Sequence, residues 1–329
     1  MFSQTKKQTA YLASLTLLFS YVEMILPRTV PFFRLGLANT AILMSFNLPL
    51  SQFALLLLLK TVASSLMAGT LLSPFFLISF AQSIFSGFLM YGMSSINKKS
   101  DERFFSVYGI SVLGSAFSAI VQIFLCSLYL GQGTFVLLGP MLIFNTISGI
   151  ITAFFCKKLG IKEIIISNDF DETNSTPQKS PALQIFFAIT ILCTTASLFF
   201  ITNIYILALA FILSLVAQKF CKRKILILPH IFLWVFVMFS TIIVPEGRIL
   251  FRVLNCSVTE GALFFGIQKS LRLSAVSALS QCAILLQAPK NSLLSLTLLY
   301  YKKLSDNFRN AKGNIFQKTK IAILKMSEL

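Results

Sequence analysis

The chain has 329 residues, of which 56% are hydrophobic and only 12% are charged, and its mean hydropathy is +0.82. A formal net charge of +17 would suggest nucleic-acid binding in a soluble protein, but here the basic residues fall mostly between apolar runs. Basic loops of this kind mark the cytoplasmic side of membrane proteins. We therefore expect an integral membrane protein with membrane lipids, and no nucleic acid, as partners.

Apolar runs of spanning length recur along the whole chain. A hydrocarbon core about 30 Å thick requires roughly 20 apolar residues per helix. Open strands cannot satisfy their backbone groups in lipid, so each run is predicted to be a helix. The sequence predicts an all-α, polytopic transmembrane helix bundle of about ten spans: 8–26, 36–48, 50–68, 74–94, 104–129, 134–156, 183–201, 203–219, 225–244 and 258–287.

The end of the first predicted span is unusually polar for a membrane protein. Glu23 is followed by a loop that contains two prolines together with Arg28 and Arg34. Gly36 and Asn39 then open the second predicted helix, whose free N-terminal amides would attract an anion beside the arginines. This pattern predicts a lid or cradle for an anionic or polar small molecule on the outer face. The alternative is a Glu–Arg pair that only fixes the loop.

Polar side chains inside other predicted spans are further candidates. Lys60 lies in the middle of the apolar run 53–66, where a lysine must face the bundle interior, a partner or water. Gln82, Gln122 and Asn145 either join helices by hydrogen bonds, which is the more common role, or line a cavity. We include Lys60 and Gln122 among the candidate substrate-binding residues.

A polar linker divides the chain into two predicted modules. Residues 161–182 are rich in Asn, Asp, Ser and Thr, a composition that cannot bury a core. The first module, residues 1–160, would hold six spans. The second, residues 183–305, would hold about four, and residues 306–329 would form a basic cytoplasmic tail near the anionic membrane surface.

The distribution of basic residues predicts the orientation. Lysines and arginines lie before the first span and after the fourth, sixth and eighth, whereas the turns after the third, fifth and seventh spans contain neither. The N terminus is therefore predicted to be cytoplasmic. Two pairs break this rule, Arg28 with Arg34 and Arg248 with Arg252. For the first pair we favour a functional role because the polar motif described above surrounds it.

Catalytic and nucleotide-binding motifs are absent from the sequence. It contains no GxxxxGK[ST] loop, so any ATP-driven step must use a partner. Asp169, Asp171 and Glu172 form the one acidic cluster, which we interpret as a solvated linker rather than a magnesium–diphosphate site. The six cysteines form no CxxC pair, and His230 is expected at the membrane interface. We expect no enzymatic activity, cofactor or metal.

Several of these segments resemble a known family. The stretch Glu23–Asn39, the stretch Gly69–Ser79, and Gly114 followed by Gln122 resemble the Gx transporter family, also called heptaprenyl diphosphate synthase component I, over about residues 10–160. Ser118 and Lys60 stand where a histidine and an arginine are expected. The family resembles the six-helix substrate-binding components of energy-coupling-factor importers, which implies that the loop between the first two helices closes over substrate from outside.

The second module resembles the transmembrane coupling component of the same importers. The pattern runs through Val258–Gly261, Gly266, Arg272 and Ala288–Pro289, within about residues 183–305. This resemblance implies that Glu260 and Arg272 serve coupling and that cytoplasmic ATPase subunits are supplied in trans.

Two classes of function follow from these patterns. The first is a transport component of a bacterial cytoplasmic membrane that binds a small molecule from outside and works with ATPases. Arg34→Ala should then abolish uptake while the protein stays in the membrane. The alternatives are a membrane accessory subunit of isoprenoid or quinone biosynthesis, which would associate with a soluble prenyl synthase, and a membrane subunit of a redox complex.

Overall fold

A computed structural model describes residues 4–25, 36–99, 104–159, 181–221, 223–225, 227–244, 247–253, 256–286, 288–289 and 292–327. The first half contains α1 (Gln4–Ile25), α2 (Asn39–Leu43), α3 (Leu50–Ala68), α4 (Pro74–Lys99), α5 (Val107–Leu130), the 3-10 helix η1 (Gln132–Leu137) and α6 (Leu138–Leu159). The second contains α7 (Pro181–Phe200), α8 (Ile204–Phe220), α9 (Ile227–Ile242), β1 (Ile249–Val253), β2 (Cys256–Thr259), α10 (Glu260–Ser280), η2 (Gln281–Leu285), α11 (Leu293–Asn310) and α12 (Ile315–Ser327).

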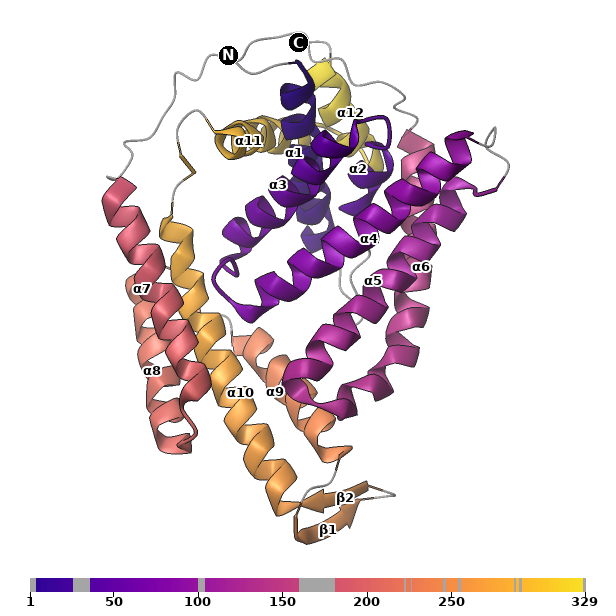
Figure 1. Cartoon of the computed structure of the whole chain (residues 1–329). Helices are drawn as coiled ribbons and strands as arrows, with labels where there is room; N and C mark the ends of the chain where they lie inside the picture. The colour runs from indigo at the N-terminus through magenta and orange to yellow at the C-terminus, as the bar shows by residue number, and fades with distance from the viewer. Residues whose placement is uncertain are drawn as a thin grey trace.

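The predicted helical membrane architecture is confirmed. In the described ranges, five helical segments are long and apolar enough to cross a bilayer, formed by α3, α4, α5, η1 with α6, and α7. The apolar helices α8 and α9 are shorter. Figure 1 shows α7, α8 and α10 side by side along one flank, with α5 and α6 on the other.

The predicted span 36–48 is wrong. Its helical part is α2, which has five residues, whereas about 20 are needed to cross the membrane. The apolar side chains of α2 from Ala41 to Leu43 are buried against protein rather than lipid. The chain then turns, and Pro49 in an extended conformation precedes the first residue of α3. Apolar character was therefore a sign of burial here, and not of a span.

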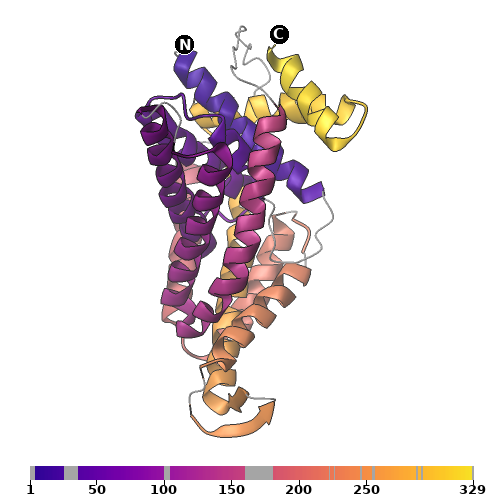
Figure 2. The ribbon, with the colours of Figure 1, turned by 90° about the vertical axis from the view of Figure 1, so that its right-hand side faces the viewer.

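The predicted span 258–287 also differs in detail. It begins within β2, which pairs antiparallel with β1 so that Ile249 lies opposite Thr259. Thr259 then caps α10, because its hydroxyl accepts a hydrogen bond from the Ala262 amide at 3.3 Å. The hairpin lies at the end of the molecule opposite the two chain termini (Figures 1 and 2).

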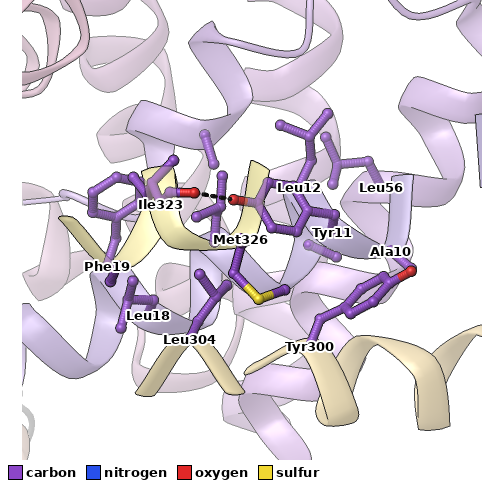
Figure 3. Packing of buried hydrophobic residues seen from close by; sticks show 14 of the residues in the cluster. Ala10, Tyr11, Leu12, Leu18, Phe19, Leu56, Tyr300, Leu304, Ile323 and Met326 are labelled. Atoms are coloured by element: carbon purple, nitrogen blue, oxygen red, sulfur yellow. Dashed lines mark hydrogen bonds between the residues drawn. The ribbon is translucent and has the colours of Figure 1, made fainter. Parts of the chain in front are cut away.

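Helix α1 lies at the centre of the largest buried apolar cluster. Its side chains pack against α3, α11 and α12, and the Tyr11 and Tyr300 rings meet edge to face with centroids 6.1 Å apart. Figure 3 shows the Tyr11 hydroxyl donating to the Ile323 carbonyl of α12, a distance of 3.5 Å. The segment predicted as a basic tail thus contains the end of α11 and all of α12, and it packs onto the first half of the chain.

Candidate functional site

The candidate site is a group of polar residues where α1, α2, α3 and α6 meet. The Lys60 ammonium in α3 donates a hydrogen bond of 2.7 Å to the Asn39 side-chain carbonyl in α2. Glu23, near the end of α1, lies close enough for its charge to act on Lys60. We call Glu23, Gly36, Asn39, Lys60 and Thr152 the polar cluster. A cation in an apolar helix needs partners of this kind, because leaving it unpaired is costly.

Gly36 joins three elements at the edge of this cluster. Its amide donates to a Glu23 carboxylate oxygen at 3.3 Å, and its carbonyl accepts from the Thr152 hydroxyl of α6 at 3.3 Å. Its φ of 66° lies in the left-handed region that favours glycine. A Cβ atom at this position would also lie only 2.6 Å from the Ser148 hydroxyl oxygen. Both the backbone conformation and the close approach of α6 therefore require glycine here.

Two of the amides at the start of the second helix are paired with backbone carbonyls. The Asn39 amide donates to the Gly36 carbonyl at 2.8 Å, and the Thr40 amide donates to the Leu37 carbonyl at 2.9 Å. Among the residues of the polar cluster, Lys60 carries the positive charge that could meet an anion. The predicted arginines, Arg28 and Arg34, lie outside the described residues, between Glu23 and Gly36 in the sequence.

Gln122 and its neighbours form a separate polar contact. Gln82 of α4 donates to the Ser118 hydroxyl of α5 at 2.5 Å, which joins the two helices. Gln122 follows Ser118 by one turn of α5 and is half-buried, while Asn145 donates to the Met141 carbonyl of its own helix. Within the described ranges, no hydrogen bond connects Gln82 or Gln122 to the polar cluster.

The two predicted coupling residues lie in different surroundings. Glu260 is exposed at the start of α10, whereas Arg272 lies about 18 Å further along the helix, at about 1.5 Å per residue. The Arg272 guanidinium donates to the Ile201 carbonyl at 2.7 Å. The structure therefore does not bring Glu260 and Arg272 together.

Arg272 lies near two other donors on α10, Gln268 and Lys269, which the sequence interpretation did not single out. Gln268 donates to the Thr202 carbonyl at 2.6 Å, and Lys269 donates to the Leu130 carbonyl at 3.0 Å. We call Gln268, Lys269 and Arg272 the α10 donors. They reach backbone carbonyls at the C-terminal ends of α5 and α7, where a positive charge is stabilised by the helix dipole. Their spacing places them on one helix face, and this pattern was the feature of the sequence that could have identified them.

Thr152 and Ser148 are the other residues that the sequence interpretation missed. They lie four positions apart on α6, so they share one helix face toward Gly36. For metal binding, the described part of the chain contains no group of three His, Cys, Asp or Glu residues that could hold an ion. The acidic residues Asp169, Asp171 and Glu172 lie outside that part.

Two family models match the chain. Residues 12–159 match the model described as heptaprenyl diphosphate synthase component I, and residues 181–286 match one described as a domain of unknown function (DUF8519). No curated protein and no solved structure shows a significant match. The likeness to energy-coupling-factor importers is not shown by these matches and stays a prediction.

Proposed function

We propose that this membrane protein, whose residues 12–159 match the model described as heptaprenyl diphosphate synthase component I, binds a small polar or anionic molecule at the polar cluster and imports it with ATPase partners. The observation that supports this proposal is the Lys60–Asn39 hydrogen bond of 2.7 Å beside the Glu23 carboxylate. Ionisable groups inside a membrane bundle are costly, and those that are kept commonly mark substrate pathways.

The proposed roles follow from the charges of the cluster. A carboxylate or phosphate of the substrate would take the Lys60 ammonium as its counter-ion, with Asn39 as a hydrogen-bond partner. Glu23 would hold the Gly36 amide and so fix the end of the loop. Arg28 and Arg34 are proposed to bring further positive charge from that loop when it closes over the substrate.

We propose that the chain lies in a bacterial cytoplasmic membrane with its N terminus inside. In support, the N and C termini lie at the same end of the molecule (Figure 1). Lys157 and Lys158 are exposed at the end of α6, and the Lys158 ammonium lies 4.8 Å from the centre of the Phe316 ring in α12. Positive charge of this kind favours the cytoplasmic side.

The proposed coupling path runs through α10. The α10 donors connect the ends of α5 and α7, so a displacement of α10 would reach the first half of the chain directly. ATPase subunits acting on the second half would use this connection. Arg272 would then be a positioning residue for coupling, while nothing in the surroundings of Glu260 adds support for the role predicted for it.

A second proposal rests on the family description alone. The family description names a component of a prenyl diphosphate synthase. It supports the proposal that this chain is an accessory membrane subunit that associates with a soluble synthase. A synthase of this class needs clustered carboxylates to hold magnesium and diphosphate, and the partner would supply them.

Affinity purification of the intact protein from its own membranes in mild detergent tests both proposals. Mass spectrometry would identify co-purified proteins and small molecules. Paired ATPase subunits together with a polar ligand are the expected result. Recovery of a prenyl synthase without ATPases would overturn the import proposal and support the accessory role. The Lys60→Met variant should retain protein partners but lose the ligand.

A further inference from the structure

We propose that the β1–β2 hairpin and the first turns of α10 form an in-plane anchor in the phospholipid headgroup region of the leaflet opposite the chain termini. We call this segment, residues 247–253 with 256–265, the hairpin anchor. The proposal does not depend on the transport function. It concerns where this end of the molecule meets the lipid and which lipid groups it contacts.

The hairpin anchor exposes large apolar side chains. Ile249, Leu250 and Phe251 are 47%, 51% and 52% exposed, and Phe264 and Phe265 on α10 are exposed as well. Large exposed apolar side chains of this kind are unfavourable in water. Large apolar side chains of α9 are exposed as well, and on such an apolar helix lipid is the natural cover.

The flanking charges match phosphate groups. Arg248 and Arg252 are both exposed, and Arg252 lies opposite Ser257 in the hairpin. An arginine can leave its stem against apolar surface while its guanidinium reaches a phosphate, with which it forms strong paired hydrogen bonds. This contact would explain why Arg248 and Arg252 lie on the predicted outer side, although basic residues usually mark the cytoplasmic side.

The depth of the hairpin follows from its backbone and from the length of α9. A two-stranded sheet has open edges whose backbone groups need water, so it cannot lie in the hydrocarbon core. Helix α9 has 16 residues, or about 24 Å, which is less than the core thickness of about 30 Å. The hairpin lies across the ends of α9 and α10 (Figures 1 and 2), where its apolar side chains extend this short apolar length to the interface.

Tryptophan fluorescence in lipid tests the anchor. The chain has a single tryptophan, Trp234, so Phe251→Trp in a Trp234→Phe background places one indole on the hairpin. In nanodiscs, this indole should be quenched more by lipids brominated near the headgroup than by lipids brominated at the chain ends. Lys325→Trp in the same background, an exposed position on α12, is the control for quenching by aqueous acrylamide.

Two outcomes would overturn the proposal. Strong acrylamide quenching without bromine quenching would place the hairpin in water. An indole protected from both quenchers would show that protein covers it, either a partner or a second copy. Quenching should also respond to charge: Arg248→Gln with Arg252→Gln should lower the bromine quenching, whereas Lys320→Gln with Lys325→Gln should not. Equal quenching in both double variants would remove the arginine–phosphate contact.

Discussion

Lys60 keeps its place in an apolar helix because Asn39 accepts its hydrogen bond and Glu23 supplies a nearby negative charge. Replacing it by methionine, which has a similar length, leaves the Asn39 side-chain carbonyl without its donor and removes the positive charge near Glu23. We expect Lys60→Met to lower the free energy of unfolding by about 1–3 kcal/mol. Lys60→Arg should retain most of the stability because the charge remains. Thermal unfolding in detergent measures both, and equal stability of all three proteins would contradict the described contact.

Substitution of Gly36 is a second test of the polar cluster. We expect Gly36→Ala to cost more than about 1 kcal/mol, because φ is positive there and the new methyl group would approach Ser148. Gly92 in α4 is the matched control, since nothing lies within 4 Å of an added Cβ atom. Gly92→Ala should stabilise the helix by about 0.5–1 kcal/mol. Unfolding midpoints of the two variants should therefore shift in opposite directions.

Part of the polar cluster could be predicted from the sequence. Glu23, Gly36, Asn39 and Lys60 were all singled out because each is a polar or special residue in an apolar context. The bond between Lys60 and Asn39 could not be predicted, because it joins residues 21 positions apart and depends on how α2 packs against α3. Thr152 was missed for the same reason. A hydroxyl residue in a predicted span does not indicate a site unless its contact, here with Gly36, is known.

Among the elements of the second half, α10 carries donors both to the end of α5 in the first half and to the end of α7 in its own half. Removing the Arg272 guanidinium leaves the Ile201 carbonyl at the end of α7 without its charged donor. We expect Arg272→Ala to destabilise the protein by about 1.5–3 kcal/mol. Under limited proteolysis, the α7–α8 turn should become more accessible. Lys325→Ala, at an exposed position on α12, should leave both readouts unchanged. A parent-like cleavage pattern in Arg272→Ala would contradict the described contact between α10 and the end of α7.

Helix α11 holds the C-terminal segment against α1 through one apolar face. Leu304 is completely buried in that face, whereas Lys302 is exposed on the other side. Leu304→Ala should cost about 2–5 kcal/mol through lost burial and the cavity that remains. Lys302→Ala should stay within about 0.5 kcal/mol. Denaturation curves of the two variants check this difference, and equal losses would mean that α11 is not docked as described.

Element boundaries show where apolar periodicity was informative and where it was not. The long runs became α3 to α7 almost as predicted, because a run of about 20 apolar residues has few alternatives in a membrane protein. The run 36–48 failed because burial against protein and burial in lipid select the same residue types. The β1–β2 hairpin was missed because its strands of five and four residues directly precede a helix.

In the whole molecule, the two halves are joined more closely than the polar linker suggests. The predicted linker, residues 161–182, lies almost entirely outside the described residues. On either side of it, α11 packs on α1, and α10 reaches the ends of α5 and α7. The contacts of α11 with α1 and of α10 with α5 link positions more than one hundred residues apart, so composition alone could not predict them. A change of conformation in one half is therefore expected to alter the conformation of the other.

The most direct test of the account is the small-molecule content of purified protein. The parent, Lys60→Arg and Lys60→Met would be isolated under the same mild conditions, and their bound compounds extracted and identified by mass spectrometry. If Lys60 binds the ligand, a polar or anionic compound should be found in the parent and in Lys60→Arg, and it should be lost from a folded Lys60→Met protein. The same compound at the same level in all three would contradict ligand binding at the polar cluster.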